Sequence, residues 1–266
     1  MATHLIHLSD THFGPEREFT VRGAPVLDRA RRVVEEINAL PFQPAAVIHT
    51  GDIANDPFDE AYRIAEEVFS DLNAPIYYTT GNHDDVPMMR EHLTFHNGMN
   101  PLVPESENRH AYTIEIDGIA LFILDGKVPP EEGPHGNLSE TQISALTDFV
   151  ENESGPFAVF NHFPALPIGS KWIDNNLPLK NGREFHEILK SAGADRFYGS
   201  FFGHLHRGLQ IYHDNILYSA VSSPACQFTA GPNDEYCDFL PDVPICFNHI
   251  TFANGITQVK EYTFPS

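Results

Sequence analysis

Apolar and polar residues follow two different periods along the first third of the chain. The short apolar runs "HLIHLSD" (4–10), "AAVIHTGD" (45–52) and "PIYYTTGNHD" (75–84) predict β-strands. Between them, "VLDRARRVVEEINAL" (26–40) and "DEAYRIAEEVFSDL" (59–72) repeat apolar residues every three or four positions, which predicts amphipathic helices. The alternation of strands and helices favours β-α-β units with parallel strands.

The later part of the chain places expected strands next to one another. Between "AYTIEI" (111–116) and "IALFILD" (119–125) stands Asp117-Gly118, a dipeptide that predicts a tight hairpin turn. A loop rich in Pro and Gly follows, and we expect a helix to open at Ser139. Further strands are expected at "PFAVFNH" (156–162), "RFYGSFFGHLH" (196–206), "LQIYH" (209–213), "ILYSA" (216–220), "CFNHITF" (246–252) and "TQVKEYTF" (257–264), with a helix at 183–191. The pattern therefore indicates a mixed α/β fold.

The length of the chain suits one main unit. With 266 residues it fits a single α/β domain, and we expect one domain over residues 1–266. The sequence has no internal repeat and no low-complexity tract. Residues 222–244 are rich in Pro, Asp and Cys, and this segment either caps a pocket or forms a dimer contact. A homodimer or higher homo-oligomer therefore stays an open alternative.

Charge and cysteine content restrict the partners. Acidic residues outnumber basic ones by 37 to 16, and the net charge of −21 repels nucleic-acid polymers and anionic membrane surfaces. No run approaches the roughly 18 to 20 apolar residues that cross a bilayer, so we expect a soluble, cytoplasmic protein. The cysteines Cys226, Cys237 and Cys246 lack C-x-x-C spacing. We expect free thiols, with one disulfide or an intersubunit contact as the alternative.

Polar side chains follow five of the expected strands, at the point where each apolar run stops. In α/β folds the carboxyl ends of strands are where sites are built. These side chains are Asp10 with His12, Asp52, Asn82 with His83 and Asp84, His162, and His204 with His206. One such end is more simply a turn or a capped loop, but five ends with oxygen or imidazole donors indicate a common site. Other histidines lack this context and are not expected to be ligands, among them His4, His92, His96, His110, His186 and His213.

We expect an extended chain at two of these ends. In that conformation Asp10 and His12 point the same way, and so do His204 and His206, because side chains two positions apart share one face of a strand. Gly203, directly before the second pair, is expected to leave room for metals.

The donor set limits the metal. Imidazoles with two carboxylates and one amide, and no thiolate, suit Mn, Fe, Zn or Co rather than a structural zinc cage or calcium. Seven ligands exceed what one ion takes, whereas two ions about 3.5 to 4 Å apart that share one carboxylate would use them all. The expected cofactor is therefore a pair of divalent or mixed-valence transition-metal ions, an arrangement that serves in-line displacement at phosphorus.

The order of these blocks resembles a known family. The blocks are Asp10-x-His12, Gly51-Asp52, Gly81-Asn82-His83-Asp84, His162 and Gly203-His204-x-His206, and together they resemble the calcineurin-like metallophosphoesterase superfamily over residues 8–206. The stretches "GNHDD", "ILDGKVPPEEGPHGNLSETQ" and "HFPALPIGSKWIDNNLPLKNG" are most similar to class III cyclic nucleotide phosphodiesterases and related bacterial glycerophosphodiesterases. The resemblance implies a four-layer α/β/β/α sandwich of two mixed β-sheets flanked by helices.

The resemblance also implies which residues hold each metal. One ion would be held by Asp10, His12, Asp52 and His206. The second would be held by Asp52, Asn82, His162 and His204, with Asp52 as the bridge. Two divalent ions lower the pKa of a water molecule, so that hydroxide can attack phosphorus near neutral pH.

The same family places His83 near the leaving-group oxygen. We expect His83 to act as a general acid or to stabilise the phosphate, with Asp84 orienting its imidazole, and a purely structural His83 is the alternative. Substrate contacts are expected from Asn82, His83, Asp85, His135 and Trp172, which either belong to the third block or occupy long loops. For His135, an exposed loop histidine without such a contact is equally open.

Two departures from the family pattern narrow the function. Phe163 follows His162, where many members carry a second histidine, which removes any substrate contact that this histidine would make. "GDIANDP" lacks the Asp-Arg-Gly continuation of Ser/Thr protein phosphatases, and "GNHD" replaces their Gly-Asn-His-Glu, so that activity is disfavoured.

The leading hypothesis is a dinuclear metal phosphodiesterase that hydrolyses a small diester, with 3′,5′-cyclic nucleotides of the cyclic AMP type as first choice. The alternatives are a glycerophosphodiesterase or phosphomonoesterase of the same superfamily and, more remotely, a non-catalytic binding scaffold.

Overall fold

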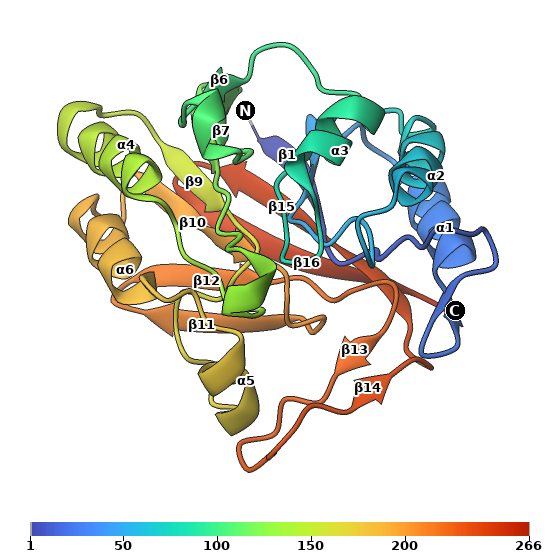
Figure 1. The fold of residues 1–266 in the computed structure, drawn as a ribbon. Coiled ribbons are helices and arrows are strands. Elements are labelled where there is room, and N and C mark those ends of the chain that lie inside the picture. The colour runs from blue at the N-terminus through green and yellow to red at the C-terminus, as the bar shows by residue number, and fades with distance from the viewer. Residues whose placement is uncertain (1, 266) are drawn as a thin grey trace.

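Two mixed β-sheets lie face to face in the centre of the protein, and helices cover the outer face of each (Figure 1). The structure is a computed structural model that describes residues 2–265. Buried apolar side chains form three layers, one between the sheets and one between each sheet and its helices. The four-layer α/β/β/α sandwich expected from the sequence is confirmed.

The first sheet has the strand order β16-β15-β1-β4-β5. Its strands are β1 (Thr3–Leu8), β4 (Ala46–His49), β5 (Ile76–Tyr78), β15 (Ile245–Ala253) and β16 (Ile256–Phe264). β1, β4 and β5 are parallel, as the predicted β-α-β units require, whereas β15 and β16 are antiparallel additions at one side. Every residue of β4 is buried, because layers cover both faces of this central strand.

The second sheet has the order β11-β12-β10-β9-β8-β7-β6. Its strands are β6 (Asn100–Pro101), β7 (Tyr112–Ile116), β8 (Ile119–Ile123), β9 (Phe157–Phe160), β10 (Phe197–Phe202), β11 (Leu209–His213) and β12 (Ile216–Ala220). β8, β9, β10 and β12 are parallel, and the remaining strands are antiparallel. The predicted hairpin joins β7 to β8, and both turn residues, Asp117 and Gly118, have positive φ as a type I′ turn requires.

The helices separate into two groups, as Figure 1 shows. The first sheet is covered by α1 (Val26–Asn38), α2 (Asp59–Phe69) and α3 (Val86–His92). The second is covered by α4 (Glu140–Asn152), α5 (Lys171–Asn176) and α6 (Gly182–Ser191), and two short 3₁₀ helices are η1 (Glu105–Glu107) and η2 (Pro130–Glu132). The predicted start of α4 is confirmed, because Ser139 Oγ accepts the backbone N–H of Gln142.

The layer between the sheets aligns their strand ends. The rings of Phe160 and Phe201 stack there with centroids 4.9 Å apart. At the carboxyl ends of the strands, Thr79 Oγ1 donates to the backbone oxygen of Leu124 at 2.7 Å, which joins the first sheet to the second. The polar residues that follow strands of either sheet therefore come out at one edge of the sandwich.

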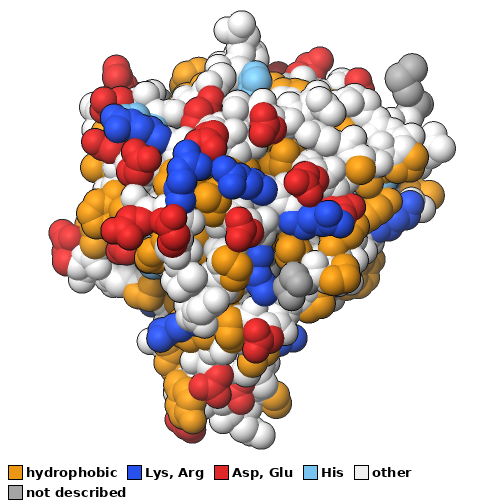
Figure 2. Space-filling model, turned by 90° about the vertical axis from the view of Figure 1, so that its right-hand side faces the viewer, with side chains coloured by type: hydrophobic (Ala, Val, Ile, Leu, Met, Phe, Trp, Pro, Cys, Tyr) orange, Lys and Arg blue, Asp and Glu red, His pale blue; other side chains and the backbone are white. Residues whose placement is uncertain are grey.

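Two small hairpins flank this edge. One joins β2 (Thr20–Val21) to β3 (Ala24–Pro25), and the other joins β13 (Gln227–Phe228) to β14 (Phe239–Leu240) within the segment 222–244. The second hairpin and α5 lie at the bottom of Figure 1, where the molecule tapers in Figure 2. Lys171 of α5 forms an exposed ion pair with Glu235 of the hairpin loop, 2.7 Å long.

The three cysteines agree with the expectation of free thiols. Within residues 2–265, Cys226, Cys237 and Cys246 are all free thiols, and burial raises the pKa of Cys226 and Cys246 to about 12, which makes these thiols unreactive. Acidic and basic side chains are interspersed on the face seen in Figure 2. No helix in the described part of the chain has the length and apolar character needed to span a membrane.

Candidate metal centre

The five polar blocks meet beyond the carboxyl ends of β1, β4, β5, β9 and β10. The backbone N–H of Asp10 donates to the oxygen of Gly51 at 2.9 Å, which joins the first block to the second. The backbone N–H of His204 donates to Asp10 Oδ2 at 3.1 Å, and His162 Nδ1 donates to the Thr50 oxygen at 2.7 Å. The two sheets therefore contribute to one site.

Five of the predicted ligands have a left-handed backbone. Their φ angles are 59° at Asp10, 50° at His12, 54° at Asp52, 66° at His204 and 53° at His206. The expected extended chain is therefore wrong, because β1 ends at Leu8 and β10 at Phe202, before the ligand pairs begin. This conformation costs a residue other than glycine about 1–3 kcal/mol, and it persists where the surrounding structure fixes a functional group.

Glycines allow the blocks to approach one another. A Cβ atom at Gly51, whose φ is 95°, would lie 2.3 Å from the backbone nitrogen of Gly81, and one at Gly81 would lie 2.0 Å from Asp52 Oδ1. At Gly203 a Cβ would lie 1.8 Å from Ser9 Oγ. Gly203 thus makes room for Ser9, directly after β1, and for the carboxylate of Asp10, whose Oδ2 would lie 2.7 Å from such a Cβ. That it leaves room for metals stays a prediction.

Buried carboxylates and imidazoles form two groups that share Asp52. The groups are Asp10, His12, Asp52 and His206, and Asp52, His162 and His204, with the donor atoms of each group within 4.8 Å of one another. Asp52 Oδ2 lies 3.7 Å from His12 Nε2 and 3.3 Å from His162 Nε2. His12 Nε2 and His206 Nε2 face each other at 2.9 Å. Such spacings separate neighbouring ligands around an ion bound at about 2.0–2.2 Å.

The hydrogen bonds of the imidazoles leave ring nitrogens available at the centre. His206 Nδ1 donates to the backbone oxygen of Cys226 at 3.0 Å, so its Nε2 presents a lone pair to the cluster. His204 Nε2 and Asn82 Oδ1 are buried and have no hydrogen-bond partner among the described residues. Because buried polar atoms are almost always paired, these two acceptors indicate a group that the protein atoms do not supply.

The charges of the cluster also favour a cation. Burial holds the pKa of His12 and His204 well below the usual value, so both rings are neutral donors. Burial acts in the same direction on His162, but Asp52 and Asp10 beside it raise its pKa to about 9. The carboxylates thus stabilise a positive charge here, which a metal ion would supply in place of the proton. The residues present therefore fit a pair of metal ions.

His83 lies at the rim of this cluster. Its backbone N–H donates to Asp52 Oδ1 at 2.9 Å, and its Nδ1 donates to the backbone oxygen of Asn55 at 2.6 Å. Burial alone would lower the pKa of His83, but the charge of Asp52 and the Asn55 carbonyl raise it above the usual value. Asp84 does not orient this ring, contrary to the expectation, because the Asn55 carbonyl does.

Asp84 instead holds two ligand loops together. Its carboxylate accepts the backbone N–H groups of Ile53 at 3.0 Å, Ala54 at 3.1 Å and Gly81 at 2.9 Å, and also the hydroxyl of Tyr62 at 3.3 Å. The side chain is fully buried and fixes the loop after β4 against the loop after β5. Asp84 therefore positions the loops that carry Asp52 and His83.

We expect Asp84→Asn to destabilise the folded protein by about 2–3 kcal/mol, because the amide turns an N–H donor toward backbone N–H groups that lose a charged acceptor. Urea unfolding of the metal-loaded protein measures this, with Asp71→Asn, an exposed carboxylate, as the matched control. A change below about 0.5 kcal/mol, the range of ordinary surface substitutions, would show that Asp84 does not hold the loops.

A cavity of about 370 Å³ opens beside the cluster. Its lining residues are His12, Phe19, Thr20, Val21, Arg22, Asn55, His83, His206, Phe228 and Phe239. Phe19, Arg22, Phe228 and Phe239 could not be predicted from the sequence, because no strand-end pattern marks them. The lining includes the predicted substrate contact His83 but not Asn82, and it also lacks Asp85, His135 and Trp172.

Those three residues occupy other surroundings. Asp85 caps α3, where its side chain accepts the backbone N–H of Met88. Trp172 lies on α5 and packs against the apolar core under the second sheet. His135 is partly buried beside Gly136, where a Cβ would lie 2.4 Å from the ring of Phe163. Their substrate contacts stay predictions.

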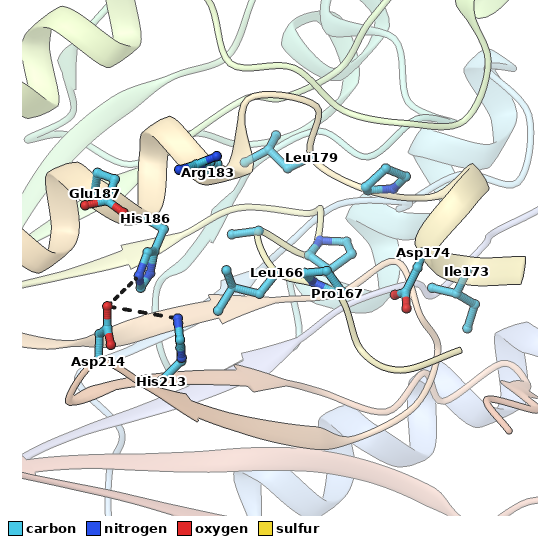
Figure 3. Close-up of a pocket in the computed structure, with 13 residues that line it drawn as sticks. Leu166, Pro167, Ile173, Asp174, Leu179, Arg183, His186, Glu187, His213 and Asp214 are labelled. Atoms are coloured by element: carbon cyan, nitrogen blue, oxygen red, sulfur yellow. Dashed lines mark hydrogen bonds and ion pairs between the residues drawn. The ribbon is translucent and has the colours of Figure 1, made fainter. Parts of the chain in front are cut away.

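A second cavity of about 390 Å³ lies away from these ligands (Figure 3). His186, His213, Asp214 and Glu187 gather at one of its ends, Ile173 and Asp174 lie at the other, and Leu166, Pro167 and Leu179 lie between them. At the polar end His186, His213 and Asp214 form a third group of donor atoms. Lys190 Nζ already lies 2.6 Å from Asp214 Oδ2, and His186 Nδ1 is paired with the Tyr218 hydroxyl at 2.8 Å. These internal partners disfavour metal binding at this cluster.

The protein is thus a two-sheet sandwich with paired Asp and His groups at its strand ends, an arrangement that can hold metal ions. The family model for calcineurin-like phosphoesterases matches residues 3–208. The chain belongs to this family. Family membership and the buried cluster together indicate a dinuclear metal site.

Curated relatives include two kinds of phosphodiesterase. The chain is 30% identical over 257 residues to the glycerophosphodiester phosphodiesterase GpdQ of Enterobacter lignolyticus (strain SCF1), covering 92% of this chain and 86% of the relative. It is 25% identical over 233 residues to the 3′,5′-cyclic adenosine monophosphate phosphodiesterase CpdA of Vibrio vulnificus (strain CMCP6), covering 86% of this chain and 79% of the relative.

Solved structures share the fold. The purple acid phosphatase PPD1 from yellow lupin seeds superposes with a TM-score of 0.62 at 12% identity, over 99% of this chain and 52% of that one. GAP50, the anchor in the inner membrane complex of Plasmodium, also has a TM-score of 0.62, at 13% identity over 99% of this chain and 88% of that one. At these identities the likeness extends to the fold alone.

Proposed function

We propose that the protein is a dinuclear metal-dependent phosphodiesterase that hydrolyses small phosphodiesters, with 3′,5′-cyclic nucleotides as the first choice. The observation that carries this proposal is the pair of buried donor groups that share Asp52. One ion would be held by Asp10, His12, Asp52 and His206, and the other by Asp52, Asn82, His162 and His204. Such a shared carboxylate suits two ions that act together on one phosphoryl group.

The donor set supports Mn, Fe, Zn or Co as the ions, because imidazoles and carboxylates without thiolates suit these metals. When bound, a metal pair supplies a nucleophile at neutral pH and offsets charge on the phosphoryl oxygens. The protein holds the donors in place beforehand, through the Thr50 carbonyl on His162 and the Cys226 carbonyl on His206. These carbonyls fix the ring orientation that metal binding needs.

His83 is the group on this chain that suits proton donation. The Asn55 carbonyl holds the Nδ1–H, which leaves Nε2 as the nitrogen available to a substrate in the cavity that His83 lines. A proton on this Nε2 can be delivered to a departing alkoxide. His83 therefore serves as general acid, and the rigid Asp52–Asn55 loop sets its position.

The segment 222–244 serves as a cap over its own site in this proposal. Ser223 Oγ donates to the backbone oxygen of Asp10 at 2.7 Å, and the ring of Phe228 stacks on His206 with centroids 4.1 Å apart. Both contacts join the segment to the metal centre of the same chain. A role in a dimer is the alternative for its exposed loop.

The names of the relatives support a diester substrate and leave two classes to compare, cyclic AMP and glycerophosphodiesters. The test is a panel of cyclic AMP, glycerophosphoethanolamine and p-nitrophenyl phosphate, assayed with manganese, iron, zinc or cobalt. We expect kcat/KM for cyclic AMP to exceed that for the other two by at least about tenfold. A preference for glycerophosphoethanolamine would favour glycerophosphodiesterase activity instead. If no substrate were turned over with any metal, the proposal that the protein is an enzyme would be refuted.

A further inference from the structure

We propose that the cavity beside the metal centre is a binding subsite for a planar nucleobase, with Arg22 and Phe239 as its recognition pair. This inference deepens the proposed function, on which it rests, by naming the part of the substrate that the protein recognises. The cavity joins the metal centre directly, since His12, His83 and His206 form one of its walls. A phosphate bound at that wall would place its ester substituent between the two flanking hairpins.

Aromatic rings continue the wall that His206 begins. Phe228 stacks nearly parallel on His206, with an interplanar angle of 13°. Phe239 meets Phe228 edge to face with centroids 4.9 Å apart. Phe19 completes the wall from the other hairpin and lies against Gly14, where a Cβ would be 2.0 Å from its ring. Stacking on aromatic faces is the usual way that proteins hold an unpaired base.

Arg22, which lines this cavity, has a strained left-handed backbone. Arg22 and Gly23 are the two central residues of the β2–β3 turn, and both have positive φ, at 54° and 93°. A type I′ turn of this kind favours Asn-Gly, so arginine is a costly choice at its first position. Strain of this kind persists at functional sites, which points to a use for the guanidinium.

The guanidinium lies where it can act on a ligand. The Arg22 Cζ atom is 4.2 Å from the centroid of the Phe239 ring, so the two side chains form one cation–aromatic surface across the two hairpins. Arg22 is the one arginine among the described residues that line the cavity, whereas the chain as a whole has a net charge of −21. It therefore offers hydrogen-bond donors and local positive charge to an anionic nucleotide that enters the cavity.

Hydrogen bonds hold the second hairpin over the site. Arg29 of α1 is buried and donates to the backbone oxygens of Pro224 at 3.1 Å and Pro241 at 2.8 Å, at the two ends of the segment 222–244. Arg207 Nε donates to the Phe228 oxygen at 2.7 Å. The aromatic wall is thus pre-formed, which favours a rigid flat ligand.

A nucleobase fits this surface better than a glycerol or ethanolamine group. Three aromatic rings and a guanidinium provide flat surfaces that an aliphatic polyol cannot stack on, and the lining residues Thr20 and Asn55 can pair with the polar edge of a base. A volume of about 370 Å³ falls in the range of about 300–1,000 Å³ that small-molecule sites occupy. We therefore expect the cavity to bind a nucleoside substituent more tightly than an aliphatic one.

Two variants test the subsite in the metal-loaded protein. Arg22→Asn removes the guanidinium and suits the turn, and Phe239→Leu removes the ring. We expect each to lower the ratio of kcat/KM for cyclic AMP to kcat/KM for glycerophosphoethanolamine about tenfold, through KM for cyclic AMP, since one stacked base contributes about that much. Arg22→Asn should melt at the same or a higher temperature. Tyr236→Leu, an exposed aromatic in the same segment, is the matched control.

Binding gives a second readout that does not need turnover. Calorimetry of the manganese-loaded wild type should show tighter binding of adenosine 5′-monophosphate than of glycerol 3-phosphate, and both variants should reduce that preference. Failure of the wild type to cleave any diester would end the proposed function while this measurement still tests the subsite. An unchanged ratio in both variants, or equal affinity of the wild type for the two monophosphates, would overturn the inference.

Discussion

Asp52→Asn should remove the bound metal ions and the phosphodiesterase activity together. Asp52 belongs to both donor groups, and its carboxylate lies 3.7 Å from His12 Nε2 and 3.3 Å from His162 Nε2. A neutral amide cannot offset the charge of two cations with one side chain. Because a metal pair supplies several kcal/mol to phosphoryl transfer, we expect kcat/KM to fall on the order of 10³-fold or more. Metal content by mass spectrometry and the cyclic AMP assay measure the two effects.

The matched control for this substitution is Asp214→Asn. Asp214 also lies beside two histidines, but it pairs with Lys190 away from the predicted ligands. This variant should keep two ions for each chain and wild-type activity. If Asp52→Asn retained two tightly bound ions, the shared-carboxylate assignment would be wrong, even with low activity.

The fold could be predicted because the apolar pattern and the turn chemistry are local. The alternation of strands and helices predicted the parallel strands, and Asp117-Gly118 predicted the β7–β8 hairpin. The meeting of the ligand blocks also follows from sequence, because carboxyl ends of parallel strands share one edge. In agreement with that prediction, the structure brings together six of the ligand residues: Asp10, His12, Asp52, His162, His204 and His206.

The conformation of the ligand residues could not be predicted in the same way. A strand pattern implies extended backbone, but the chain turns left-handed at His204 and His206. This left-handed backbone is stabilised by contacts from distant segments, such as the hydrogen bond from the His204 N–H to Asp10. Loop conformations that depend on long-range contacts leave no periodic signal in the sequence.

The contact partners of individual side chains could not be predicted from the sequence either. Adjacency in sequence suggested that Asp84 orients His83, whereas Asn55 does so from another loop. The cavity wall brings together Arg22 and Phe239, which are far apart in the chain. Such pairs arise from how the hairpins pack, and no motif records them.

His83→Gln should lower kcat for cyclic AMP by about 10²- to 10⁴-fold, the range that general acids contribute. The glutamine keeps the backbone N–H that Asp52 Oδ1 accepts, so the metal content should stay at two ions. The loss should depend on the leaving group, because an alkoxide needs a proton and p-nitrophenolate does not. For bis(p-nitrophenyl) phosphate we therefore expect a loss below about tenfold.

The control for this variant is His213→Gln, an exposed histidine outside the site, which should behave as the wild type. A general acid and a residue that only stabilises the phosphate differ in one respect. A proton donor is needed in proportion to the basicity of the leaving group, whereas phosphate stabilisation serves both substrates alike. Equal losses for cyclic AMP and bis(p-nitrophenyl) phosphate would therefore assign His83 to the phosphate and leave protonation of the leaving group to another donor.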